Sequence, residues 1–134
     1  MRRPRVLIVD DQVLNIELAA FVLRNADFEV ACASSARQAL AQVQAFRPEL
    51  ILMDIQLPDI DGLALTQQFK ADPATRHMVV VAFTAYAMKG DEARMRDAGC
   101  DGYISKPIDV ATFADTVRAM LPRHGSAGPP LRQG

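Results

Sequence analysis

Apolar residues along the chain follow two patterns that alternate. Three short segments are apolar at nearly every position, at residues 6–9, 50–53 and 78–83. Continuous runs of this length are typical of strands that are covered on both faces. Between them, apolar residues recur at three- and four-residue intervals, as Leu14 and Leu18 do, and this spacing predicts amphipathic helices.

The two patterns together predict five strands that alternate with five helices. Ser35, Asp61 and Asp109 are suited to cap helices, and Gly99 and Pro122 are suited to end them. We expect strands at residues 6–9, 28–33, 50–53, 78–83 and 103–104, and helices at residues 14–25, 36–46, 63–70, 89–98 and 110–121. This alternation predicts one α/β domain built on a parallel sheet.

Apolar side chains at helical spacing define three of these helices. They are Leu14, Leu18, Phe21 and Val22 in the first, Ala36, Leu40 and Val43 in the second, and Val110, Phe113, Val117 and Leu121 in the last. The helix at residues 89–98 is mostly polar by comparison.

Chemically reactive side chains follow four of the five predicted strands. Asp10 and Asp11 come directly after the first strand, Asp54 after the third, Thr84 after the fourth and Lys106 after the fifth. Ligands of open parallel sheets bind beyond the carboxyl ends of the strands. We therefore expect three carboxylates, a hydroxyl and an ammonium group to meet at one edge of the sheet.

This combination of groups is suited to phosphoryl transfer. Three adjacent carboxylates repel one another unless a positive charge compensates them, and their oxygens are ligands that Mg²⁺ prefers, with Mn²⁺ as an alternative. Asp54 is then a candidate nucleophile, with Thr84 and Lys106 facing the phosphoryl oxygens. Each residue alone would be interpreted as a turn former, a cap or a solvated side chain, and only their joint placement favours a site.

Charge and composition exclude other classes of function. The 134 residues include 15 basic and 16 acidic side chains, a net charge of −1. All the acids and ten of the basic residues lie within residues 6–122, which therefore carry −6, and this argues against binding nucleic acid. No apolar run is long enough to cross a membrane or to serve as a signal peptide, so we expect a cytoplasmic protein. Cys32 and Cys100 are expected to be small buried residues.

The motifs VLIVDD, LILMDIQLPDIDG, VVAFTAYAMKGDE and AGCDGYISKPID resemble those of the receiver domain of bacterial two-component response regulators, in the CheY-like superfamily. The resemblance spans roughly residues 5–121 and is greatest to single-domain regulators, and it extends to receivers attached to hybrid histidine kinases. It implies a flavodoxin-like, doubly wound (βα)5 fold with strand order 2-1-3-4-5 and helices on both faces of the sheet.

The resemblance also implies a role for each residue of the predicted site. Asp54 matches the phosphoacceptor, and Asp11, Asp54 and the backbone carbonyl of Gln56 match direct Mg²⁺ ligands, with Asp10 acting largely through water. Thr84 and Lys106 match residues that grip the phosphoryl oxygens. It further implies that Tyr103 is the switch aromatic and that the Lys106–Pro107 peptide is cis.

The implied function is that of a phosphorylation-driven signalling switch in a two-component phosphorelay. A histidine kinase or phosphotransfer protein would donate the phosphoryl group, and a partner protein would read the face formed by the fourth helix, fifth strand and fifth helix. That face includes Ala87, Met88, Lys89 and Tyr103. We interpret the chain as a stand-alone switch that assists its own phosphorylation and dephosphorylation, and not as an enzyme acting on other substrates. Residues 5–122 would form the receiver, between a basic tail at 1–4 and a flexible Gly- and Pro-containing tail at 123–134.

Three alternatives remain open at this point. An aspartyl-phosphate hydrolase would use the same carboxylates, but Gln56 stands where such enzymes usually have a second acid. A dinucleotide-binding module is disfavoured because the turn after the first strand lacks glycines. The chain would also fit a receiver excised from a hybrid kinase.

Overall fold

The computed structural model describes residues 3–85 and 89–122, and it alternates strands and helices as predicted. The elements are β1 (Arg5–Val9), α1 (Val13–Asn25), β2 (Glu29–Ala33), α2 (Ala36–Phe46), β3 (Leu50–Met53), α3 (Gly62–Ala71), β4 (Val79–Thr84), α4 (Lys89–Ala98), β5 (Gly102–Ser105) and α5 (Phe113–Met120). The predicted tail at 123–134 and most of the predicted face at 87–89 lie outside the described residues.

The five strands form one parallel sheet in the order β2-β1-β3-β4-β5, which confirms the predicted topology. Val9 at the end of β1 is paired with Met53 at the end of β3, and Thr84 at the end of β4 with Ser105 at the end of β5. This register places the carboxyl ends of four strands at one edge of the sheet, where the predicted site residues follow.

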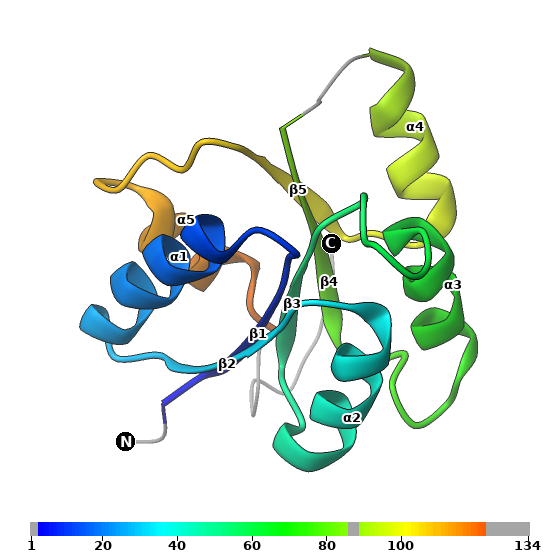
Figure 1. Cartoon of the computed structure of the whole chain (residues 1–134), viewed down its shortest axis with the longest axis horizontal. Coiled ribbons are helices and arrows are strands. Elements are labelled where there is room, and N and C mark those ends of the chain that lie inside the picture. The colour runs from blue at the N-terminus through cyan, green and yellow to red at the C-terminus, as the bar shows by residue number, and fades with distance from the viewer. Residues whose placement is uncertain (1–2, 86–88, 123–134) are drawn as a thin grey trace.

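Helices cover both faces of the sheet (Figure 1). α1 and α5 lie on one face, and α2, α3 and α4 lie on the other. Successive residues of β1 point alternately into the two layers, so that Val6 and Ile8 belong to the core under α1 and α5, and Leu7 and Val9 to the core under α2 and α3. This explains why the strands are apolar at every position.

The apolar spacing predicts α1 correctly, but most of the side chains that carry this spacing are exposed. Leu14 is 79% exposed, Phe21 66% and Leu18 43%. The buried face consists instead of Ala19, Ala20, Val22 and Leu23. The two alanines have short side chains that allow the helix to lie close to the sheet, and this leaves the larger residues on the outside.

In α2, too, one of the predicted packing residues is exposed, and the predicted start of α5 needs a separate correction. Leu40 is 43% exposed, while Ala36 and Val43 pack as expected. The last helix begins at Phe113, after a turn in which the Asp109 carboxylate accepts a hydrogen bond from Ala111 N (3.0 Å). Asp109 therefore caps this turn, and not the helix itself.

Several other predicted ends of helices are confirmed. The Ser35 side chain accepts a hydrogen bond from Gln38 N at the start of α2, and Asp61 accepts one from Leu63 N (2.8 Å) at the start of α3. α4 ends at Ala98, directly before Gly99, whose φ of 106° belongs to the left-handed region that glycine adopts without strain.

The two cysteines are half-buried, and not fully buried as expected. Burial raises the pKa of both thiols. Among residues 3–85 and 89–122, no helix has the length and apolar content needed to cross a membrane.

Candidate functional site

Three carboxylates meet at the carboxyl edge of the sheet, as predicted. Asp10, Asp11 and Asp54 each have an oxygen within 4.8 Å of an oxygen of the others. Asp10 is fully buried and Asp54 is 6% exposed, whereas Asp11 faces solvent. Carboxylates at this separation repel one another strongly unless a cation lies among them.

The buried carboxylate of Asp10 is held from both sides. Its Oδ1 accepts a hydrogen bond from Gln12 N (2.9 Å) at the start of α1. Its Oδ2 makes no hydrogen bond within the part of the chain that the structure describes, but lies 2.6 Å from Lys106 Nζ. The ion pair with Lys106 therefore provides the main compensation for this buried oxygen.

Lys106 contacts several parts of the sheet edge. Its Nζ lies 3.8 Å from Asp54 Oδ1 and 5.0 Å from the centre of the Phe83 ring, and its backbone N–H donates to Thr84 O (2.8 Å). The Lys106–Pro107 peptide is cis, as the resemblance implies. The ammonium group is thus fixed between the acids that follow β1 and β3.

The Asp54 carboxyl group lies in an environment that disfavours its charge. Burial raises its pKa from 3.8 to about 6, and hydrogen bonding from Gln56 N (3.1 Å to Oδ1) and the charge of Lys106 lower it only in part. The charges of Asp10 and Asp11 raise it further. The backbone of Asp54 is fixed because its N–H donates to Val9 O (2.8 Å) in the sheet.

The loop after Asp54 turns back tightly against it. Gly62 N donates to Ile55 O (2.7 Å), and Gln56 pairs with Asp61 in an isolated antiparallel bridge. A Cβ atom at position 62 would lie 2.1 Å from the Asp54 carbonyl oxygen, so only glycine fits there without movement of the backbone. This close approach fixes the loop that carries Gln56.

The predicted switch residues lie on neighbouring strands. Thr84 is buried at the end of β4, and Tyr103 lies on β5, opposite Ala82. Tyr103 is 38% exposed, and its hydroxyl donates to Glu92 Oε2 (3.1 Å) on α4, which raises the pKa of Tyr103. Tyr103 is therefore turned outward in this structure.

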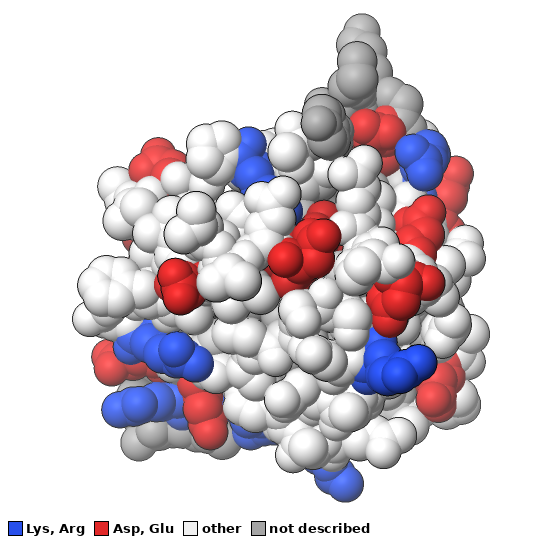
Figure 2. All heavy atoms as spheres, viewed as in Figure 1, with Lys and Arg blue, Asp and Glu red and all other residues white. Residues whose placement is uncertain are grey.

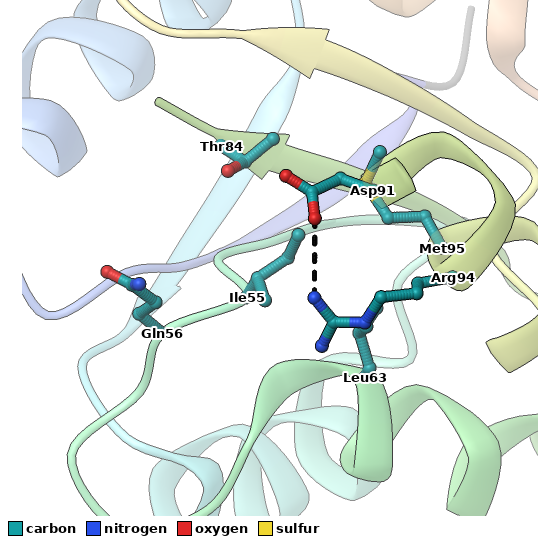
Figure 3. Close-up of a pocket in the computed structure, with 7 residues that line it drawn as sticks. All are labelled: Ile55, Gln56, Leu63, Thr84, Asp91, Arg94 and Met95. Carbon is teal, nitrogen blue, oxygen red and sulfur yellow. Dashed lines mark hydrogen bonds and ion pairs between the residues drawn. The ribbon is translucent and has the colours of Figure 1, made fainter. Parts of the chain in front are cut away.

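Sequence reasoning missed a pocket beside the site. It has a volume of about 330 Å³ and is lined by Ile55, Gln56, Leu63, Thr84, Asp91, Arg94 and Met95 (Figure 3). Arg94 Nη1 donates to Asp91 Oδ1 at 3.3 Å. The sequence indicates that α4 is polar, but it does not indicate which of its charges face the site. Met95, on the same helix, is buried in the core.

The sequence also did not indicate the contacts of Asp59. Its carboxylate accepts hydrogen bonds from Ala36 N (2.9 Å) and Arg37 N (3.1 Å) at the start of α2. These hydrogen bonds lower the pKa of Asp59. The residue connects the loop after Asp54 to α2 across 23 positions of sequence, a separation at which no local pattern identifies a capping residue.

The residues at the edge fit a hard divalent cation. Asp10, Asp11 and Asp54 supply oxygen donors only. Together with the ammonium group of Lys106, which contacts Asp10 and Asp54, these three carboxylates have a formal charge of −2. Oxygen ligands with excess negative charge are typical of Mg²⁺ sites. On the face shown in Figure 2, basic side chains lie apart from one another and form no continuous patch.

Comparison with known proteins relates this geometry to a family. Residues 6–118 match the response regulator receiver domain. The chain is 45% identical over 116 residues to the polar-differentiation response regulator DivK of Brucella anthropi, covering 87% of this chain and 94% of that one.

Solved structures of similar proteins have the same fold. A response regulator from Chloroflexus aurantiacus is 30% identical with a TM-score of 0.85, covering 91% of this chain and all of that one. The receiver domain of a sensor histidine kinase from Pseudomonas aeruginosa is 28% identical with a TM-score of 0.79, covering 89% and 98%, and it has a magnesium ion coordinated in its active site cleft. These matches decide against the hydrolase and dinucleotide-binding alternatives. The chain belongs to the response regulator receiver domain family and is a signalling switch of a two-component system.

Proposed function

We propose that this receiver takes up a phosphoryl group on Asp54 and signals through contacts with other proteins. The observation that carries the proposal is the position of Asp54, directly after β3, beside Lys106 and close to Asp10 and Asp11. A carboxylate oxygen of Asp54 attacks the phosphorus of a phosphohistidine whose other ring nitrogen carries a proton. The P–N bond breaks, its electron pair stays on the ring nitrogen, and the histidine leaves as a neutral imidazole.

Asp10, Asp11 and Asp54 are the side chains that hold Mg²⁺, together with the backbone carbonyl of Gln56. Their donor set and excess negative charge support this assignment, as does the magnesium ion in the similar Pseudomonas receiver. Mn²⁺ prefers the same oxygen ligands and would occupy the same position. When bound, the cation neutralises charge on the transferring group.

Thr84 and Lys106 receive the phosphoryl oxygens. Lys106 is well placed because its ammonium group already lies within 4 Å of Asp54 Oδ1 and is shielded on one side by the Phe83 ring. With these groups in place, the chain assists its own phosphorylation and the later hydrolysis of the acyl phosphate. The reaction therefore needs positioning and charge stabilisation more than acid–base chemistry.

The added charge acts on Thr84 and Tyr103 to change the surface. Movement of Thr84 toward the phosphoryl group leaves room for the Tyr103 ring to turn inward, and the hydrogen bond from Tyr103 to Glu92 then breaks. This changes the face formed by α4, β5 and α5, which is the proposed contact surface for the downstream partner. The expected compartment is the cytoplasm.

An exposed apolar face of α1 supports a protein as the phosphoryl donor. Val13 and Leu14 follow Asp11 by two and three residues, and Phe21 continues the same face two turns further along the helix. All three side chains are more than half exposed. Exposed large apolar residues beside a site are typical of a protein–protein contact surface. A histidine kinase or phosphotransfer protein that donates to Asp54 would cover this face.

The test is phosphorylation of wild type and Asp54→Asn by a phosphorylated histidine kinase and by acetyl phosphate in Mg²⁺. We expect uptake of one phosphoryl group by wild type and none by the variant, measured by intact-mass spectrometry. Thermal unfolding of the variant checks that it folds. Uptake by Asp54→Asn at the wild-type rate would contradict the proposal.

A further inference from the structure

The pocket beside the site has a charged wall that the proposed function does not use. Gln56 and Thr84 line the pocket on the side away from α4, and Asp91 and Arg94 line it from α4 (Figure 3). Its volume of about 330 Å³ lies at the lower end of the roughly 300–1,000 Å³ typical of small-molecule sites. The pocket is therefore large enough for a small phosphoryl donor next to Thr84 and to the two residues that follow Asp54.

The two charges of this wall differ in how deeply they lie. The Asp91 side chain is 26% exposed and the Arg94 side chain 61% exposed. One oxygen of Asp91 faces the guanidinium group, and the other points to the side of the pocket on which Thr84 lies (Figure 3). An anion that enters the pocket therefore meets the carboxylate of Asp91 as well as the guanidinium group that neutralises it.

We propose that the Asp91–Arg94 pair sets the rate at which small acyl phosphate dianions phosphorylate this receiver, an inference that rests on the proposed role of Asp54. In the reaction, an Asp54 oxygen forms a bond to phosphorus, the bond from phosphorus to the acyl oxygen breaks, and the carboxylate leaves. For acetyl phosphate, the products are the acyl phosphate on Asp54 and acetate, with no net change in protons or charge.

The direction of each effect follows from charge. The edge carboxylates already repel an anionic donor, and Asp91 adds to this repulsion at the entrance while Arg94 opposes it. Loss of Arg94 leaves Asp91 unpaired and slows the reaction, whereas loss of Asp91 leaves Arg94 to attract the donor. For a dianion about 10 Å away in a largely aqueous path, each single change alters the rate by roughly two- to fivefold.

The test compares Arg94→Gln, Asp91→Asn and the double variant with wild type in Mg²⁺, with acetyl phosphate as the donor. We expect a slower rate for Arg94→Gln, a faster rate for Asp91→Asn, and a rate close to wild type for the double variant. Phosphoramidate carries less negative charge at neutral pH, so its rates should change less. Both differences should shrink as the salt concentration rises.

Matched controls come from the same helix. Arg96→Gln and Asp97→Asn remove the same charges from exposed positions that do not line this pocket. Single variants that change the rate in the same direction, or by no more than these controls, would overturn the inference. Phosphorylation that no longer requires Asp54 would instead overturn the proposed function, so the two failures are distinguishable. Thermal unfolding confirms that each variant is folded.

Discussion

The pKa of the Asp54 carboxyl group is set by influences that act in opposite directions. Burial and the neighbouring Asp10 and Asp11 favour its neutral form, whereas Gln56 N–H and Lys106 favour the charged form. Burial is the largest of these influences, and it raises the pKa to about 6. The charge that would make Asp54 a nucleophile is therefore maintained at a cost in stability when no cation is bound.

This cost predicts how Asp54→Asn changes stability with pH. Between pH 4 and 6, folded Asp54 retains a proton that the unfolded chain has lost, so wild-type stability falls as pH rises through this window and stays lower above it. Asn cannot ionise, so the variant should unfold at similar urea concentrations to wild type near pH 4. Above pH 7 it should be more stable by about 1–3 kcal/mol.

Urea unfolding followed by circular dichroism, in EDTA to remove divalent cations, measures this difference. Asp115→Asn, an exposed acid on α5, serves as the control and should show no such dependence. A difference between Asp54→Asn and wild type that is the same at pH 4 and pH 8 would contradict the raised pKa.

Residues differ in how well the sequence predicts their positions relative to the site. The positions of Asp10, Asp54, Thr84 and Lys106 are predictable because each lies at or directly after the end of a strand, and strand ends are brought together by topology. That of Asp91 is not, because a position on a polar helix does not indicate which charges face a pocket. Contacts that depend on the path of a loop leave no local pattern in the sequence.

At the scale of elements, α1 shows the limit of periodicity. Its helical spacing is correct, but Leu14 and Phe21 lie in solvent, and the helix packs through smaller residues. Periodicity measures which residues share a face, not which face meets the sheet. When both sides of a helix carry apolar residues, the side that allows closer packing is the one that meets the sheet. In α1 this is the side with Ala19 and Ala20, whose side chains are short. The large residues Leu14 and Phe21 are left exposed on the outer face of α1, where we propose that the phosphoryl donor docks.

This surface predicts a selective loss of phosphotransfer. Replacing Leu14 and Phe21 together by serine should lower kcat/KM for transfer from a phosphorylated histidine kinase by roughly tenfold or more, because exposed apolar anchors contribute about 1–2 kcal/mol each to contact surfaces. The rate with acetyl phosphate should change less than twofold. The kinase used in this test would be chosen from a panel of purified histidine kinases, as the one that phosphorylates the wild-type protein fastest.

Leu40→Ser is the matched control, because Leu40 is an exposed leucine on α2, on the opposite face of the sheet. It should leave both rates unchanged. Equal losses with the kinase and with acetyl phosphate would indicate damage to the site and not to a docking surface.

For the whole molecule, the small net charge conceals its distribution. The chain carries −1 overall, but three of its acids gather at the edge of the sheet, and two of them, Asp10 and Asp54, lie beside Lys106. The repulsion among these acids is a property of the fold, because strands distant in sequence must pair before the acids meet. A cation bound there should stabilise the folded state and not the unfolded one.

Mg²⁺ should therefore raise the melting temperature of wild type. At a concentration 100 times Kd, the expected stabilisation is about 2.7 kcal/mol, or roughly 5–10 °C for a chain of this size. Asp11→Asn removes an exposed donor with little effect on packing, and should greatly reduce the shift in a thermal titration. A shift of the same size in Asp11→Asn would place the cation elsewhere.

Lys106 has a further consequence for how the sheet edge responds. Its side chain contacts the acids after β1 and β3, and its backbone is bonded to the end of β4 while it follows β5 directly. Lys106 therefore connects the carboxyl ends of four strands. A displacement of any one of these strand ends is transmitted through Lys106 to the other three. We therefore expect the four strand ends to move together and not one at a time.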